Sequence, residues 1–145
     1  MSKYQLRIEK CCATPRITNS KLKQIAQSVL AGEGIERATI NIVLVDDAYM
    51  IELNQKYLQH DEPTDVLSFN LSDDVSELLE GEIYADVDQI ARQAQDYGVD
   101  FEEEVTRIII HGILHLIGYD DRTDLERKNM TKKEDEYLTI YKQGR

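Results

Sequence analysis

The feature that most constrains the fold of this chain is the segment 105–117, in which eight of the thirteen residues are large and apolar. These residues would cover all sides of a helix rather than one stripe, and a helix of that kind is buried. Glu102, Glu103 and Glu104 come directly before the segment, where negative charge favours a helix N-terminus. A chain of 145 residues is long enough for one domain with a single core, so we expect this helix to lie inside that core.

The rest of the sequence alternates between strand patterns and amphipathic helix patterns, without a repeat or a linker. Strands are expected at about 4–9, 38–45, 66–71 and 81–87, with helices that begin at Asn19, at Asp46 or Asp47, and at Asp88. The acidic residues 73–80 are expected to form a loop, and a last amphipathic helix to occupy about 123–141. We therefore predict a single α+β domain over residues 1–145, with a small mixed sheet of about four strands backed by helices.

Composition excludes several classes of protein. No stretch approaches the ~20 apolar residues that span a bilayer, and the first residues lack the apolar core of an export signal. Cys11 and Cys12 are adjacent and are the only cysteines, so a disulfide framework is excluded, in keeping with a reducing cytoplasm. We expect a cytoplasmic protein that does not contact membranes. The net charge of −11 argues against broad, nonspecific affinity for nucleic acid, which needs a basic surface.

Two histidines in the apolar helix indicate a metal site. His111 and His115 are four residues apart, so their rings leave the same face of the helix. Buried imidazoles need polar partners, and one divalent ion satisfies both at once. The spacing therefore predicts a metal-binding helix, with zinc as the ion that most often uses such a pair.

The residues after the second histidine suggest a third ligand. Gly118 can take the left-handed conformation that ends a helix, which lets the chain turn back and present Asp121. This order is that of the metzincin zinc motif, with a carboxylate in place of the last histidine. Three protein ligands leave a position for water, as in catalytic sites. Asp120 is a rival third ligand, although the motif spacing favours Asp121.

The residue that follows the first histidine decides what kind of hydrolase this chain can be. A zinc peptidase needs a glutamate there as general base, and this chain has Gly112. A metal ion could still activate water and polarise a phosphoryl oxygen. The site therefore favours phosphodiester hydrolysis over peptide hydrolysis.

The segment 111–121 resembles the signature of the YbeY family, bacterial endoribonucleases that mature ribosomal RNA. Further blocks agree with the same family, and the resemblance spans roughly residues 39–136. These blocks are Leu53-Asn54, Tyr57, Asp61, the run 63–69, Gly81-Glu82-Ile83, and Glu126 with Met130 and Glu134 in the last helix.

The resemblance implies a zinc-dependent endoribonuclease for single-stranded RNA, with one divalent ion per chain held in a cleft by His111, His115 and Asp121 as catalytic ligands. It implies a role in maturing the 3′ end of small-subunit ribosomal RNA and in ribosome quality control, with ribosomal proteins as partners. Two positions depart from the family pattern. A third histidine is usual where this chain has Asp121, and an arginine, a natural phosphate ligand, is usual where it has Leu58.

Substrate contacts are suggested only by position. Arg107 and Arg122 could bind phosphate, and Tyr119 could stack on a base, although ordinary ion pairs and helix-end packing explain these residues equally well. In the run 63–69, Thr64, Asp65 and Ser68 could line the substrate groove or simply form the turn before the strand.

Three functions follow in order of preference. The first is the metal-dependent endoribonuclease. The second is a zinc-binding ribosome-assembly factor that cleaves little or nothing, which the acidic surface and Leu58 favour. A zinc metallopeptidase is a distant third because of Gly112.

Overall fold

The computed structural model of the protein describes residues 3–13, 17–58, 65–74 and 77–143, with the backbone alone at 57 and 58. Its centre is a four-stranded sheet in the order β1-β2-β4-β3, in which β1, β2 and β4 run parallel and β3 pairs antiparallel with β4. The strands are β1 (Lys3–Lys10), β2 (Arg37–Val45), β3 (Val66–Asn70) and β4 (Leu79–Asp86). The helices are α1 (Asn19–Gly32), α2 (Asp47–Leu53) with a π-helical turn η1 (Asn54–Leu58), α3 (Val87–Tyr97), α4 (Phe101–Ile117) and α5 (Asp124–Gln143). This confirms the α+β fold with a mixed four-stranded sheet.

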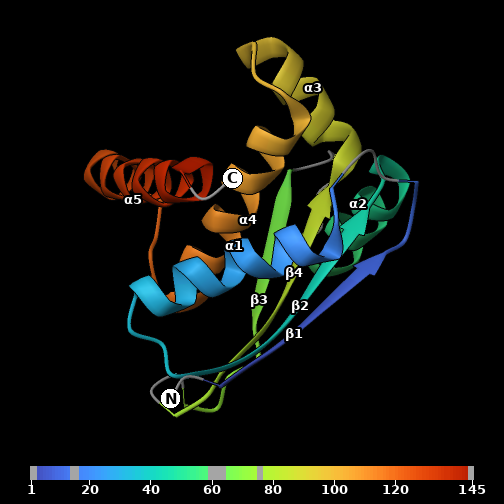
Figure 1. Ribbon diagram of the computed structural model, residues 1–145. Coiled ribbons are helices and arrows are strands. Elements are labelled where there is room, and N and C mark those ends of the chain that lie inside the picture. Colours follow the sequence, from blue (N-terminus) through green and yellow to red (C-terminus); the bar gives the residue numbers. More distant parts are fainter. Residues whose placement is uncertain (1–2, 14–16, 59–64, 75–76, 144–145) are drawn as a thin grey trace.

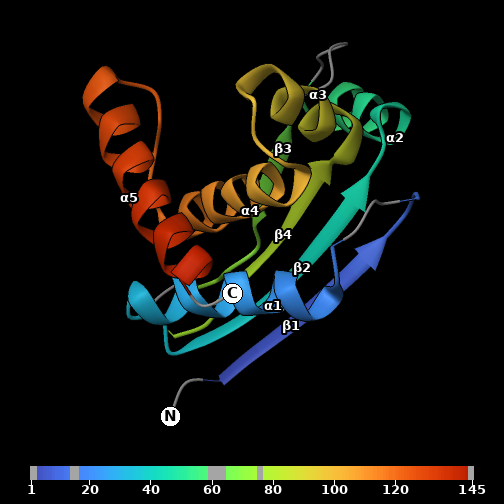
Figure 2. The same cartoon turned by 45° about the horizontal axis from the view of Figure 1, so that its top comes forward.

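The two faces of the sheet are covered unequally. Successive strand residues point to opposite faces, so Ile42 and Leu44 of β2 join the main core while Val43 and Val45 join a smaller cluster. The main core includes residues of α1, α3, α4 and α5, whereas the smaller cluster is closed by α2. Figures 1 and 2 show α1, α4 and α5 together on one side of the sheet. Parallel strands buried on both faces explain the continuous apolar run of β2.

Helix α4 is the central element of the main core, as its sequence predicts. It contacts α1, α3, α5, β3 and β4, and most of its side chains are buried. Two glycines allow its close approach to the sheet. A Cβ at Gly81 would lie 2.8 Å from Leu116, and a Cβ at Gly112 would lie 3.0 Å from Ile83. The glycine of the third sequence block therefore makes room for α4.

Several element boundaries differ from the sequence expectation. Thr18, not Asn19, caps α1, because its hydroxyl accepts from the Lys21 backbone N–H at 3.1 Å. Strand β4 begins at Leu79, inside the expected acidic loop, because β4 continues its parallel pairing with β2 there. Asp86 rather than Asp88 caps α3. Within the part of the chain that the structure describes, no helix combines the length and apolar composition needed to cross a bilayer.

Candidate metal centre

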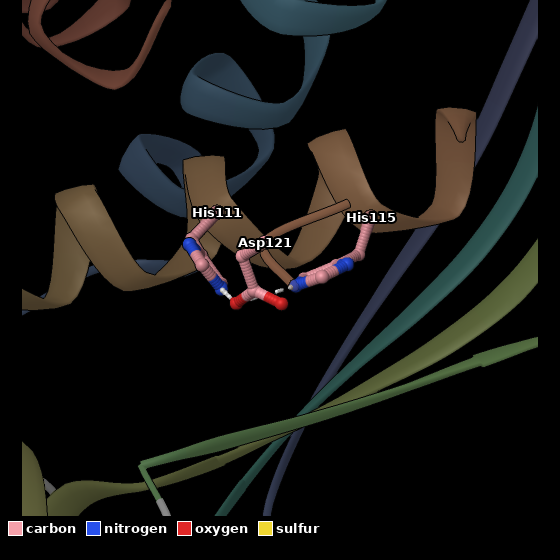
Figure 3. Close-up of side chains that lie close together, drawn as sticks. All are labelled: His111, His115 and Asp121. Atoms are coloured by element: carbon pink, nitrogen blue, oxygen red, sulfur yellow. Dashed lines mark ion pairs between the residues drawn. The ribbon is translucent and has the colours of Figure 1, made fainter. Parts of the chain in front are cut away.

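Helix α4 presents His111 and His115 together on the face that looks toward β3. Their ring centres are 4.6 Å apart, and their side chains are 23% and 28% exposed. The helical repeat places the rings on adjacent turns, while the apolar residues between them point into the core. Figure 3 shows both rings directed at the same point outside the helix. The pair is thus accessible from a groove instead of being enclosed in the core.

The third candidate ligand comes from the loop after α4. Gly118 has φ of 126°, in the region that favours glycine, and the Tyr119 backbone N–H closes the helix on Leu114 O at 3.0 Å. The chain then returns along α4 and brings Asp121 beside the histidines (Figure 3). Asp121 Oδ2 lies 3.6 Å from His111 Nε2 and 3.4 Å from His115 Nε2. Three potential ligand atoms therefore converge from a helix and the loop that follows it.

The spacing and chemistry of these three groups fit one small divalent ion. Two imidazole nitrogens and one carboxylate oxygen are common zinc ligands. Ligand atoms about 2.0–2.1 Å from a tetrahedral ion lie about 3.3–3.4 Å from each other. The separations of 3.4 and 3.6 Å between Asp121 Oδ2 and the two Nε2 atoms are close to that value. Three protein ligands leave one tetrahedral position for water or substrate.

Glu134 of α5 orients His111 from behind. His111 Nδ1 lies 2.7 Å from Glu134 Oε2, so the N–H on this ring nitrogen donates a hydrogen bond to the carboxylate and Nε2 is the candidate ligand atom. Burial disfavours the imidazolium, but the hydrogen bond and charge of Glu134 outweigh burial and raise the pKa of His111. Glu134 is part of the sequence blocks, but the sequence does not indicate its contact with His111, because the two residues are 23 positions apart on different helices.

The candidate ligands line a groove of about 360 Å³. Its other wall is β3 with the residue before it, which together contribute Asp65, Val66, Leu67, Ser68 and Asn70. The hydroxyl of Ser68 and the amide of Asn70 donate to backbone carbonyls of α4, at 3.2 and 3.0 Å, and so fasten strand to helix. Asp65 is half-buried and is the acid in this lining besides Asp121. A wider hollow along α5 contains none of the candidate ligands.

Asp65 and Ser68 line the groove as suggested, whereas Arg107, Arg122 and Tyr119 do not line it. Arg107 is engaged by two acids of α5, at 3.3 Å from Glu134 and 2.7 Å from Asp135. Arg122 is 84% exposed and makes a loose contact of 3.6 Å with Asp120. Asp120 is thus directed at an arginine while its neighbour Asp121 faces the histidines, which favours Asp121 as third ligand.

Tyr119 belongs to a cluster that holds the loop of the third ligand. Its hydroxyl donates to Glu33 at 2.6 Å, and Tyr137 and Lys133 of α5 contact the same carboxylate. Burial alone would raise the pKa of Glu33, but the three hydrogen bonds lower it below its ordinary value. The cluster ties the ends of α1 and α4 to α5. Thr64 and the side chain of Leu58 lie outside the described residues.

The structure gives a steric reason why α4 lacks the base of a peptidase. Gly112 faces the sheet, where a Cβ would lie 3.0 Å from Ile83 and 3.2 Å from the Ser68 hydroxyl. A glutamate at this position would have to enter the contact between α4 and the two strands β3 and β4. The position therefore serves packing, not proton transfer.

The fold and the groove define a class of protein: a small α+β domain with a candidate two-histidine, one-aspartate metal centre. Comparison with known proteins identifies the family. The family model described as endoribonuclease YbeY matches residues 7–142. The chain therefore belongs to the YbeY family of endoribonucleases, which makes it a hydrolase.

Individual relatives agree with this assignment. The chain is 41% identical to "Endoribonuclease YbeY" of Flavobacterium psychrophilum, over 79% of this chain and 80% of the relative. It is 40% identical to the protein of the same name in Chlorobium chlorochromatii, over 93% of this chain and 86% of that one. The solution structure of TM1509 from Thermotoga maritima resembles it with a TM-score of 0.65 and 32% identity, covering 94% and 89% of the two chains.

Proposed function

We propose that this chain is a zinc-dependent endoribonuclease for single-stranded RNA that matures the 3′ end of small-subunit ribosomal RNA and takes part in ribosome quality control. The observation that supports it is the convergence of His111, His115 and Asp121 on one point of an open groove, in a chain of the YbeY family. Residues 1–145 act as one catalytic domain in the cytoplasm. A bound zinc ion would supply Lewis-acid stabilisation of a phosphoryl oxygen and a lowered pKa for a water molecule.

The residues of the chain divide the remaining work. Glu134 keeps the proton of His111 on Nδ1, so Nε2 stays available as a ligand. Asp65, on the opposite wall of the groove, accepts the proton of the attacking water at a carboxylate oxygen. This assignment gives the chain the base that Gly112 does not provide. The amide N–H of Gln93 donates a hydrogen bond to Asp65 Oδ2 at 3.4 Å, which limits the movement of the Asp65 side chain.

Three side chains outside the groove lining are the candidates for substrate binding. Arg122 is the arginine whose exposure and loose ion pair leave it able to reach a phosphate. Arg107 serves as a phosphate ligand only by giving up a contact with Glu134 or Asp135. Tyr119 offers a ring for base stacking, held in place by Glu33.

The acidic surface bears on how the enzyme reaches RNA. A net charge of −11 repels a polyanion, so attraction by bulk charge does not bring the two together. Ribosomal proteins, which are basic as a class, are the partners that we propose deliver this domain to its RNA.

One observation favours a second role, that of a zinc-binding ribosome-assembly factor with weak cleavage. Among the described residues that line the groove there is no lysine or arginine, and the third ligand is itself an anion. Both features lower the affinity of the groove for a phosphodiester. A peptidase role has no such support, because Gly112 packs against the sheet.

The test is cleavage of an RNA that carries the precursor 3′ end of small-subunit RNA, single-stranded and annealed to a complementary strand. Zinc-loaded wild type should cut the single strand and leave the duplex intact, and the His115→Ala variant should be inactive. Casein serves as the peptidase substrate and should remain intact. If pure zinc-loaded protein binds precursor ribosomal subunits but leaves every RNA uncut, the assembly role replaces the nuclease role.

A further inference from the structure

Three aspartates meet at the carboxyl end of the parallel strands, outside the metal centre described above. Asp47 follows β2, Asp86 ends β4, and Asp88 lies in the first turn of α3. Because β2 and β4 are parallel neighbours, their carboxyl ends lie at the same edge of the sheet. One carboxylate oxygen from each aspartate lies within 4.8 Å of the others.

Asp86 provides the observation that points to a ligand. Its side chain is fully buried, at 0% exposure. Oδ1 accepts from the backbone N–H groups of Asp88 and Gln89, at 3.0 and 3.4 Å, whereas the buried Oδ2 has no hydrogen-bond donor. A buried carboxylate oxygen without a partner is costly, so either a proton or a cation must satisfy it.

Three carboxylates and one guanidinium meet at this cluster, so negative charge exceeds positive charge there. Arg92 pairs with both carboxylate oxygens of Asp47 at 2.9 Å, and this hydrogen-bonded pair lowers the pKa of Asp47 and keeps it charged. Asp88 Oδ2 accepts from the Asp47 backbone N–H at 3.0 Å, which leaves its other oxygen available. Burial, and then the hydrogen bond and charge of Asp47, raise the pKa of Asp86 to about 7, so a proton shared with Asp47 is the competitor of a cation at this carboxyl group.

We propose that Asp47, Asp86 and Asp88 form a second site, which binds a hard divalent cation of the calcium class. Such ions take carboxylate and water oxygens at about 2.3–2.6 Å, so oxygens on opposite sides of one ion lie about 4.6–5.2 Å apart. Three oxygens within 4.8 Å of each other can therefore all contact one ion of this size. The remaining ligands are waters, because Asp88 is exposed and Asp47 partly so.

The site would brace one end of the active-site groove. It joins α2 to the start of α3, and the Asp86 backbone N–H donates to the carbonyl of Asp65 at 2.9 Å. Asp65 in turn lines the groove opposite the histidines. Cation binding should therefore stabilise the α2–α3 side of the fold and the position of Asp65, directly before β3. The inference does not depend on the proposed function.

The experiment is equilibrium dialysis of zinc-loaded protein against radioactive Ca²⁺, with Asp86→Asn and Asp96→Asn as matched variants. Asn at position 86 removes the charge but still caps α3, and Asp96 is an exposed acid of the same helix outside the cluster. Wild type and Asp96→Asn should each bind one Ca²⁺ per chain, with a dissociation constant of about 10⁻⁴–10⁻³ M. Asp86→Asn should bind at least tenfold more weakly.

A second variant and a second measurement distinguish loss of the cation site from misfolding of Asp86→Asn. Asp88→Asn changes an exposed residue and should also weaken Ca²⁺ binding, and millimolar Ca²⁺ should raise the melting temperature of wild type but not of either cluster variant. Equal Ca²⁺ binding by wild type and by both cluster variants would overturn the proposal. Absence of Ca²⁺ binding by wild type would overturn it too, and would mean that a proton satisfies Asp86 Oδ2.

Discussion

Replacement of Glu134 by glutamine tests whether the contact behind His111 controls metal affinity. The amide oxygen can still accept from His111 Nδ1, which lies 2.7 Å from Oε2 in the wild type, but the negative charge is lost. Loss of such a partner costs about 10–100-fold in metal affinity, or about 1.4–2.7 kcal/mol. We expect Glu134→Gln to bind zinc that much more weakly, with unchanged stoichiometry.

Asp135→Asn is the matched control for this change. Both acids lie on α5 and both contact the guanidinium of Arg107, but Asp135 does not contact His111. Any effect that comes only from weakening the ion pairs of Arg107 should therefore appear in both variants. Only Glu134→Gln should lose zinc affinity.

The assay is competition for zinc with a chromogenic chelator, measured from pH 6 to pH 9. Glu134 raises the pKa of His111, so protons compete with zinc over a wider pH range in wild type than in Glu134→Gln. The affinity ratio should therefore be largest at high pH and should narrow as the pH falls. Zinc affinities within threefold of each other at pH 8, for wild type and Glu134→Gln, would refute the reasoning.

Three further predictions concern other parts of the site. Asp65→Asn should lower RNA cleavage by about 10²–10⁴-fold, as loss of a general base does, while zinc content stays at the wild-type level; full activity would exclude Asp65 as the base. Glu33→Gln should lower the free energy of unfolding by about 1–3 kcal/mol at pH 7. Because the folded-state pKa of Glu33 is lowered, the difference between wild type and variant should shrink as acid protonates Glu33 below pH ~4. Urea unfolding at both pH values measures this difference, and a constant value would contradict the role given to Glu33. Gly112→Glu should fail to gain peptidase activity and should unfold at lower urea, because its side chain meets Ile83 at the helix–sheet contact; a stable variant that cleaves casein would disprove the packing role.

The local geometry of the candidate centre could be predicted from the sequence. The spacing of His111 and His115 sets their common face because an α-helix has a fixed repeat. Gly118 permits the reversal that returns Asp121 to that face, and the apolar run of α4 predicts its burial. Each of these inferences depends on the backbone conformation of one continuous segment.

Contacts between distant segments required the tertiary structure. Glu134 reaches His111, and Asp65 reaches the opposite wall of the groove, only because α5 and β3 pack against α4 in one register. The same packing turns Gly112 toward the sheet and leaves Asp86 Oδ2 buried without a donor. Helix and turn geometry are local properties of the chain. The register between elements is set by many weak contacts across the whole core, and no single segment of the sequence contains that information.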